Sequence, residues 1–441
     1  MAGAPPTGIR MVKPSAPVGV FLACSALLLV AAGVVLVRAG GDKPAQAVAE
    51  APPPPPRPHW NTDTLHQLLA AVDASGDEGL RPKDYQRDAL VAFLGQGGPV
   101  SAIEATADKA AKGLAQDYID GRIKNPARFD WHIEHSPARL VTLDVDLANA
   151  VNGGGLQDYL NGLLPTDPRY AALRRAYADT PAAEHGRRNA IRASMERWRW
   201  MPRVLGDAYV WVNIPTYKLQ LYRNGQVAAE HVVVVGAPKT PTPQLSADVG
   251  QIIVNPWWTL PPTVLREGKK YSPAKGYVWQ KIGGKMFIRQ RPGPMNALGR
   301  MKIDMPNPWA IYLHDTPAKS GFAQPMRALS HGCIRVQDIP SLAGELYDPA
   351  VIDTALQTYR MKMLPVQAKV PVYIVYFTAA PDADGEVVTY GDPYDRDARM
   401  IAALDGVKYH PPATPKKPLP KAEAQAVTVN RAVDEPERAQ P

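Results

Sequence analysis

The sequence predicts an α+β chain in which a helical domain precedes a mainly β domain of sandwich or barrel type, behind a membrane anchor. Three observations support this fold class: an uncharged apolar run near the N-terminus, helical periodicity up to about residue 200, and Val-, Ile- and Tyr-rich segments after Gly206. The expected parts are a cytoplasmic N-terminus at 1–16, a transmembrane signal anchor at 17–37, a Pro-rich linker at 38–60, a helical domain at 61–205, a β domain at 206–400 and a disordered tail at 409–441.

The apolar run at residues 17–37 is long enough to cross a bilayer, which takes roughly 20 residues. Arg10 and Lys13 precede it, and because basic residues usually stay on the cytoplasmic side, we expect the chain after Arg38 to lie outside. A cleaved signal peptide ending near Ala47 is the alternative. Both interpretations place the body of the protein outside the cytoplasm.

The segment after the linker carries apolar residues at helical spacing, with Pro and Gly between its helices. One group that shares a helix face is Leu65, Leu68, Leu69 and Val72, and another is Ile103, Ala107, Ala110 and Leu114. The last predicted helix carries Met195, Trp198 and Trp200. We expect these side chains to pack on the following domain rather than to bind sugar.

The β domain is predicted from strand-like segments at 208–214, 218–222 and 227–235, with Asn224-Gly225 as a hairpin turn between two of them. Further strands are expected at 251–255, 286–289, 310–314 and 370–378, spaced as in an antiparallel sandwich or barrel, and a helix at 339–346. Residues 256–308 are mostly loop-like and contain aromatic residues such as Trp257. A loop region this long is usually functional, so we interpret about 257–308 as a lid; a surface insertion is the alternative.

The net charge of +8 suits an anionic wall polymer or lipid headgroups, although solubility alone would also explain it. Nucleic acid is excluded as a partner, since the body is exported and shows no basic stripe with interleaved aromatics. No cofactor is expected, and the pair His132 and His135 is more typical of a helix surface than of a metal site. The sequence does not determine the oligomeric state.

The candidate nucleophile is Cys333, within Ser330-His331-Gly332-Cys333-Ile334-Arg335. The other cysteine, Cys24, lies in the apolar N-terminal run and cannot pair with it. A run that resembles a buried strand, residues 309–313, delivers His314 at its end, where its imidazole can serve as base for the thiol.

The neighbours of this pair have expected roles of their own. Consecutive strand residues point to opposite faces, so the backbone carbonyl of Asp315, rather than its carboxylate, is expected to orient His314. Gly332 permits a tight turn that would aim its N–H, with that of Cys333, at an oxyanion. Arg335 can hold a substrate carboxylate. His331 either orients the turn or takes part in catalysis, and Ser330 is expected to give hydrogen-bonding support; with Trp257 these complete the candidate substrate-binding residues.

His314, fifteen intervening residues and then Ser-His-Gly-Cys-Ile-Arg resembles the signature of the L,D-transpeptidase (YkuD-type) catalytic domain. Other segments resemble the large Gram-negative, YcbB-like subgroup of that family, and the resemblance covers about residues 60–400. These segments are residues 195–202, 212–215, 240–243, 255–258 and 312–317. The stretch at 180–196 is too short for the small peptidoglycan-binding module that this subgroup commonly carries.

The resemblance implies a helical scaffold domain and a catalytic domain in the periplasm, held to the inner membrane by a single-pass anchor. Cys333 would attack the carbonyl between the third residue of a peptidoglycan stem, usually meso-diaminopimelate, and a terminal D-Ala. An amine of another stem would open the thioester and form a 3→3 cross-link. His314 would exchange protons with thiol and amine, steadied by the Asp315 carbonyl, and carbapenems would acylate Cys333.

Three other functions stay open at this stage. A sortase-like transpeptidase also uses Cys, His and Arg behind an anchor, but its His normally lies much further upstream. An L,D-carboxypeptidase or cross-link hydrolase would use water as the acceptor, which depends on lid geometry. The third alternative is a catalytically silent wall-binding scaffold, in which a carbapenem or thiol probe would not label Cys333.

Overall fold

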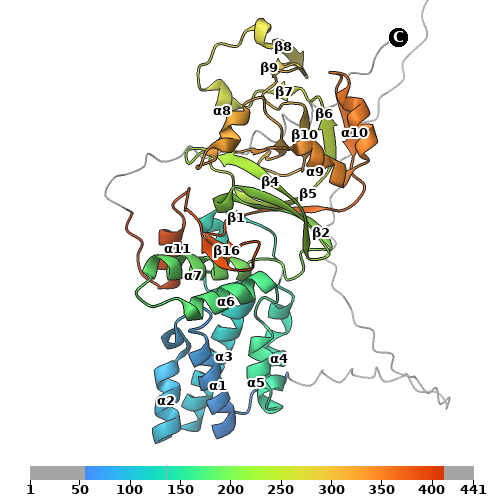
Figure 1. Ribbon diagram of the computed structural model, residues 1–441. Helices are drawn as coiled ribbons and strands as arrows, with labels where there is room; N and C mark the ends of the chain where they lie inside the picture. Colours follow the sequence, from blue (N-terminus) through green and yellow to red (C-terminus); the bar gives the residue numbers. More distant parts are fainter. Residues whose placement is uncertain (1–54, 136, 412–441) are drawn as a thin grey trace, which may run out of the picture. The chain divides into compact units, whose positions relative to one another are not determined.

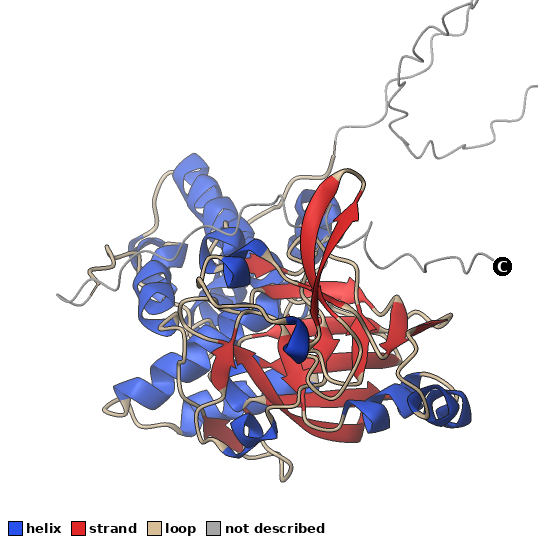
Figure 2. Ribbon diagram, turned by 90° about the horizontal axis from the view of Figure 1, so that it is seen from above, coloured by secondary structure: helices blue, strands red, loops and turns tan. Residues whose placement is uncertain are grey.

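The computed structural model describes residues 55–135 and 137–411, which fall in one compact unit of the chain. The predicted signal anchor, most of the Pro-rich linker and nearly all of the predicted tail lie outside the described residues. Among the helices that are described, none is both long and apolar enough to span a bilayer. The helices come first along the chain and most strands follow, which agrees with the predicted α+β class (Figures 1 and 2).

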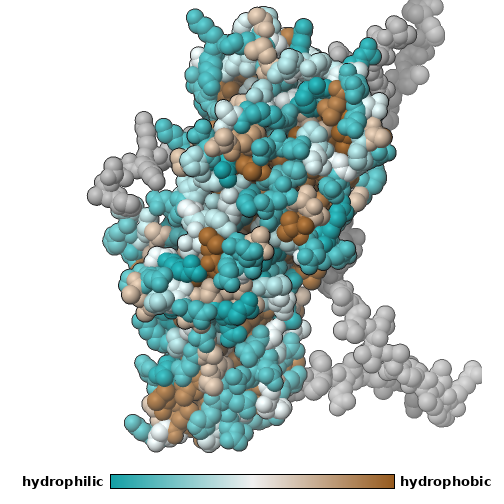
Figure 3. All heavy atoms as spheres, viewed as in Figure 1, coloured by the Kyte–Doolittle hydropathy of each residue, from teal (hydrophilic) through white to brown (hydrophobic). Residues whose placement is uncertain are grey.

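The described residues of the predicted helical region form seven α-helices, of which α1 to α5 share a core of their own, while α6 and α7 belong to a cluster that includes sheet residues. Asn61 caps the first helix, because its side chain accepts from the Thr64 amide while the Thr64 hydroxyl accepts from the Asn61 amide. The expected periodicity is confirmed: Leu65, Leu68 and Val72 are buried. Some apolar surface remains over α2, where Val91 is 43% exposed (Figure 3). The helices are α1 (Thr62–Ala74), α2 (Arg87–Gln96), α3 (Val100–Asp120), α4 (Arg139–Asn152), α5 (Leu156–Asn161), α6 (Pro168–Asp179) and α7 (His185–Arg199).

Helix α7 joins the helical region to the sheet. Met195, Trp198 and Trp200 are buried in one aromatic cluster, in which Trp198 stacks on Trp211 with ring centroids 5.6 Å apart. The expectation that these side chains pack on the next domain is therefore confirmed. In Figure 1, α6 and α7 lie between the other helices and the sheet. Because Met195, Trp198 and Trp200 bury large apolar surfaces, they contribute much of the free energy that holds the helical region against the sheet.

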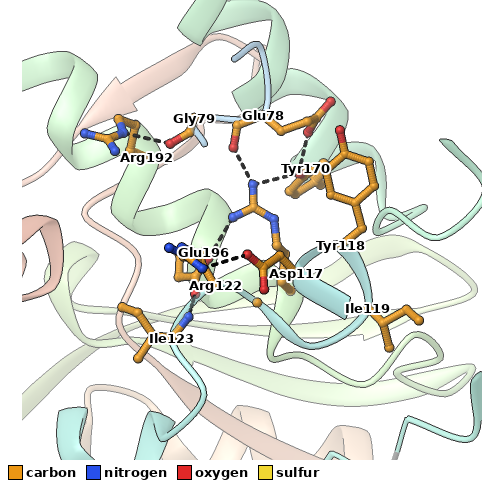
Figure 4. A network of polar contacts seen from close by, with 12 residues as sticks. Glu78, Gly79, Asp117, Tyr118, Ile119, Arg122, Ile123, Tyr170, Arg192 and Glu196 are labelled. Carbon is orange, nitrogen blue, oxygen red and sulfur yellow. Dashed lines mark hydrogen bonds and ion pairs between the residues drawn. The ribbon is translucent and has the colours of Figure 1, made fainter. Parts of the chain in front are cut away.

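A buried ionic network surrounds Arg199 at the end of α7 (Figure 4). Its guanidinium donates to Glu196 Oε2 at 2.8 Å and to the backbone carbonyl of Glu78. The other Glu196 oxygen accepts from the Ile123 amide at 2.7 Å. Arg199, Glu196 and Glu78 are each at most 1% exposed, so losing one partner would strand a charge away from water.

The main sheet has twelve strands, and β12 pairs with β4 beside the path β1-β5-β15-β2-β3-β4-β13-β11-β10-β6-β14. The predicted hairpin is confirmed: Asn224 and Gly225 both have positive φ between β3 and β4. The strands are β1 (Trp131–His132), β2 (Ala208–Asn213), β3 (Lys218–Arg223), β4 (Gln226–Gly236), β5 (Gln244–Asp248), β6 (Gln251–Val254), β10 (Met301–Asp304), β11 (Leu313–His314), β12 (Ala328–Ser330), β13 (Ile334–Val336), β14 (Lys362–Pro365) and β15 (Pro371–Val375).

The expectation of an antiparallel sheet is wrong in part, because four strand pairs are parallel: β1–β5, β15–β2, β12–β4 and β11–β13. A parallel pair needs a long connection between its strands. Residues 315–333 supply one between β11 and β13, and helices α9 (Ile339–Leu346) and α10 (Pro349–Leu356) lie in the connection that leads towards β15. β1 also shows that the helical region contributes a strand to the sheet.

In the strand order above, the strands from β1 to β4 form one half of the sheet and those from β13 to β14 form the other. Both halves bury one face in the same core. Val210, Leu219 and Val233 come from one half, and Ile303 and Ile334 from the other. The opposite face of β2 and β15 meets α7, together with α11 (Asp397–Leu404) and a small sheet of β16 (Ala379–Pro381) and β17 (Val387–Thr389). Side chains on the opposite face of β10, β11 and β13 form part of the candidate site.

The predicted lid is more regular than expected. Within 257–308 lie a three-stranded sheet of order β7-β9-β8 and a short helix, and β10 belongs to the main sheet rather than to a lid. Gly283 and Gly284, both at positive φ, form the turn between β8 and β9, so this Gly-Gly pair was an available hairpin signal. The elements are β7 (Trp258–Thr259), α8 (Pro262–Leu265), β8 (Tyr277–Ile282) and β9 (Lys285–Gln290).

Replacing Gly121 with Ala should destabilise the protein strongly, because Gly121 ends α3 at φ +80° against the Arg199 network. A Cβ there would lie 2.4 Å from Trp200 Nε1 and 2.8 Å from Glu196 Oε1. We expect a loss of about 3 kcal/mol, compared with about 1 kcal/mol for Gly154→Ala, which has φ +73° but open space around it. Denaturant unfolding followed by circular dichroism measures both, and equal losses would contradict the clash.

Candidate active site

His314 and Arg335 lie on one face of the sheet because of the strand register, and Tyr312 and Cys333 come directly before the two strands concerned. β11 and β13 are parallel, with Leu313 opposite Ile334 and His314 opposite Arg335. Residues opposite one another share a face, and alternate residues point to opposite faces. Leu313 and Ile334 are in the core, so their neighbours point away from it. Arg335 acts electrostatically on both His314 and Cys333, so the structure places the predicted guanidinium near the imidazole and near the thiol.

His314 is buried and held by its own neighbour. Its Nδ1 lies 2.5 Å from the Asp315 carbonyl oxygen, which can only accept, so Nδ1 carries the proton and Nε2 is the free acceptor. The Asp315 carboxylate points elsewhere and accepts from the Arg300 amide at 2.9 Å and from Lys319. The predicted geometry, with the carbonyl rather than the carboxylate on His314, is what the structure has.

Burial lowers the pKa of His314 to about 3, and the neighbouring Arg335 guanidinium acts in the same direction. Burial also raises the pKa of the Cys333 thiol, although hydrogen bonds from Tyr312 and the charges of Lys302 and Arg335 partly oppose this. At neutral pH the resting pair is thus a thiol and a neutral imidazole. Such a pair suits general-base activation during attack, rather than a preformed thiolate.

The turn that carries Cys333 is closed by Ser330. Its hydroxyl donates to the Cys333 carbonyl at 2.6 Å and accepts from the Gly332 amide at 3.1 Å. The expectation that the Gly332 N–H faces an oxyanion is therefore corrected, because Ser330 occupies that N–H. The Cys333 amide has no acceptor among the described residues and is the remaining donor of the expected pair. Ser330 is buried, so a supporting position describes it better than a substrate contact.

A second loop supports this turn from outside. The Thr242 hydroxyl donates to the Gly332 carbonyl at 2.6 Å and accepts from the Gly236 amide at 2.8 Å. The Thr240 hydroxyl donates to the Ser330 carbonyl at 3.0 Å. The sequence alone predicted no role for these threonines. They lie in the segment Thr240-Pro241-Thr242-Pro243, which contributed only to the family resemblance.

The predicted strand at 309–313 is wrong for most of its length. Only Leu313 and His314 are in a strand, and Ala310 has φ +53°, a left-handed conformation that is unusual for alanine. The Asn307 side chain explains the difference, since its Oδ1 accepts from the Trp309 and Ile311 amides in place of ladder partners. This bend brings the Ala310 carbonyl to 3.6 Å from Cys333 Sγ.

The other predicted substrate-binding residues occupy different environments. His331 is exposed, and its Nε2 contacts the Glu267 carboxylate of the lid. Trp257 lies beneath the Arg289 guanidinium, which is 4.7 Å from its ring centroid. Arg335 is half-buried and has no carboxylate partner among the described residues, so its charge faces the site uncompensated.

Lys302 and Tyr312 are additions that the residue-by-residue reasoning did not single out. Lys302 is opposite His314 in the β10–β11 register, is buried, and lies 4.3 Å from the Tyr312 ring centroid. The available signal in the sequence was a lysine within the strand-like segment 301–304, because lysine is rarely buried. Across residues 55–135 and 137–411, no three His, Cys, Asp or Glu side chains cluster so as to fit a metal ion.

Comparison with known proteins gives the family context. Residues 207–373 match the family described as the L,D-transpeptidase catalytic domain (YkuD), and residues 56–176 match the family described as a scaffold domain. A Haemophilus influenzae protein named "Putative L,D-transpeptidase" is 32% identical over 233 residues, or 46% of this chain and 47% of that protein. The chain spans about half the length of this relative. Residues 207–373 are therefore similar to L,D-transpeptidase catalytic domains, and residues 56–176 are similar to scaffold domains.

Solved structures with some similarity include three L,D-transpeptidases. One from Mycobacterium smegmatis is 17% identical, with 38% of this chain and 58% of that chain covered and a TM-score of 0.22. One in complex with imipenem is 15% identical, with 38% and 59% covered and a TM-score of 0.22. The catalytic domain of the Enterococcus faecium enzyme is 19% identical, with 38% and 96% covered and a TM-score of 0.18.

The neutral thiol–imidazole pair predicts an unusual pH dependence for alkylation of Cys333 by iodoacetamide. Only the thiolate reacts, and with the pKa of the thiol raised by burial, the rate should stay low from pH 5 to 8 and rise above about pH 9. Mass spectrometry of the Cys333 peptide measures this rate. A rapid, pH-independent plateau between pH 5 and 8 would instead indicate a thiolate–imidazolium pair.

Proposed function

We propose that this protein is a peptidoglycan L,D-transpeptidase with Cys333 as its nucleophile. The observation that carries the proposal is the shared face of β11 and β13, where a thiol lies with an imidazole whose Nδ1 is fixed by a backbone carbonyl. The family matches over 207–373 and 56–176 support the same function. The catalytic roles of Cys333 and His314 are part of this proposal.

The geometry supports a two-step acyl transfer. As Sγ attacks the carbonyl that joins the third stem residue to D-Ala, its proton passes to His314 Nε2, and the Cys333 amide donates to the oxyanion. Collapse of the intermediate breaks the peptide bond, and the same proton goes to the leaving amine of D-Ala. An amine of a second stem then attacks the thioester, His314 takes its proton, and the thiol is restored.

Arg335 and the lid are proposed to recognise the carboxylates of the stem. Residues 258–291 carry eight Lys or Arg side chains and only Glu267 as an acid, a net charge of +7, against +8 for the whole chain. The contact between Glu267 and His331 joins this basic region to the cysteine turn. A cation-rich cover over a site of this kind favours polyanionic substrates and accelerates their encounter.

The proposed location is the periplasmic side of an inner membrane, with the N-terminus in the cytoplasm. The support is the apolar run at 17–37 with Arg10 and Lys13 ahead of it, together with a substrate class that lies outside the cytoplasm. Fusion of a reporter that is active only in the cytoplasm to the C-terminus tests this location, and a fully active reporter would contradict it.

The function is tested by incubating the full-length chain with purified disaccharide-tetrapeptide stems, followed by mass spectrometry of the products. We expect released D-Ala and tetra-tri dimers, and a loss of both of at least about 1000-fold in Cys333→Ala, because the covalent step needs the thiol. The matched control is Cys24→Ala, which should retain full activity. D-Ala without dimers would indicate water as the acceptor, and neither product would refute an enzyme of either kind.

Charge reversal in the β8–β9 hairpin should weaken substrate binding without changing the chemistry. For Lys281→Glu/Lys285→Glu we expect the KM for tetrapeptide stems to rise about fivefold at low ionic strength and kcat to stay within twofold, with the KM difference shrinking as salt screens the charges. The control, Lys83→Glu/Lys109→Glu, makes the same charge change on exposed lysines of the helical region. An equal KM rise in the control would argue against a specific role for the lid.

A further inference from the structure

A short segment beyond the matched catalytic domain reaches the loop that supports the cysteine turn. Tyr394 follows β17 and lies outside residues 207–373, yet its hydroxyl donates to the Gly236 carbonyl at 2.7 Å and accepts from the Thr242 amide at 3.2 Å. Burial raises the pKa of Tyr394 to about 12, so the phenol keeps the proton that it donates. One hydroxyl therefore ties the two ends of the 236–242 loop together.

That loop in turn holds the backbone beside the nucleophile. Thr242 bridges the Gly236 amide and the Gly332 carbonyl, and Gly332 immediately precedes Cys333. The loop packs tightly, since a Cβ on Gly236 would lie 2.2 Å from the Thr240 carbonyl oxygen. With so little free space, a shift at Tyr394 must be passed to the turn rather than absorbed by the loop.

Tyr394 is itself fixed from the helical region. Its amide donates to the Tyr376 hydroxyl at 2.9 Å, and its ring stacks on Tyr376 with centroids 5.5 Å apart. The Arg396 guanidinium lies about 5 Å from both ring centroids and donates to the Asp130 carboxylate. Asp130 lies within the matched scaffold domain at residues 56–176.

We propose that Tyr394 is a positioning residue for the Cys333 turn, and that Asp130 and Arg396 couple the scaffold domain to this turn through it. This inference rests on the proposed function for its effect on turnover, but its structural part does not. It gives the scaffold domain a role in catalysis: to fix the segment that sets the backbone conformation next to the nucleophile.

The test is Tyr394→Phe, which keeps the ring and removes the hydroxyl. We expect kcat for D-Ala release to fall about tenfold with KM within twofold, because the turn is displaced while the binding residues stay. Alkylation of Cys333 should become faster near neutral pH, because loosening the turn admits water to the thiol and lowers its pKa. The control is Tyr373→Phe, a buried tyrosine whose hydroxyl donates to the Leu205 carbonyl at 3.2 Å, away from this loop.

A double-mutant cycle with Thr242→Val separates positioning from general destabilisation. If both side chains act along one path, the double variant should lose little more kcat than the worse single variant; independent effects would multiply and overturn the proposal. Equal kcat and equal alkylation profiles in Tyr394→Phe and Tyr373→Phe would overturn it as well. If the unmodified chain releases no D-Ala, the proposed function fails, and the alkylation profiles alone decide the role of Tyr394.

The coupling to the scaffold domain has its own variant. Asp130→Asn removes the charge that holds Arg396, and we expect the same pattern of change as in Tyr394→Phe at smaller amplitude. Asp146→Asn, a half-buried carboxylate on α4 whose partner is Thr142, is the control. If Asp130→Asn and Asp146→Asn cannot be distinguished, the link from the scaffold domain is refuted.

Discussion

The alternation of side chains along two short adjacent strands is the constraint on which the candidate site depends. Leu313 and Ile334 are fully buried in the core, and their burial forces His314 and Arg335 to the opposite face, beside Cys333. A register slip of one residue would exchange the two sets and place charged groups in the core. The hydrophobic effect that stabilises the sheet thereby also sets which side chains meet at the site.

Much of this arrangement could be predicted from the sequence. The helices, the Asn224-Gly225 hairpin and the packing of Trp198 follow from local patterns, and the position of the Asp315 carbonyl follows from alternation. The bend at Ala310 could not, because it depends on an Asn307 side chain that replaces backbone partners. The use of the Gly332 amide was wrongly predicted because a nearby hydroxyl, Ser330, competes for the same donor.

The parallel strand pairs were missed for a different reason. The spacing of strand-like segments along the chain predicts hairpins, whereas pairs such as β2–β15 and β11–β13 join strands that long connections separate. The same holds for contacts made from outside residues 207–373. Tyr394 and Asp130 have no local signature that marks them, and only the tertiary fold brings Tyr394 to the 236–242 loop and Asp130 to Arg396.

The helical region and the strands that follow it share more than a contact surface. Arg199 and Arg197 lie two residues apart on α7 and bind different parts of the protein. Arg199 donates to the Glu78 carbonyl of the helical region, and Arg197 donates to Asp397 of α11 at 2.7 Å. Both are fully buried, so moving α7 away from either the Glu78 segment or α11 would leave one of these charges without its partner. We therefore regard the two as one cooperative structure.

The un-ionised state of Cys333 has a consequence for damage to the protein. The thiolate, not the thiol, attacks peroxides and disulfides, so a sulfur whose raised pKa keeps it protonated is oxidised slowly. The same burial that raises the pKa of Cys333 would thus protect the side chain from oxidative damage at neutral pH.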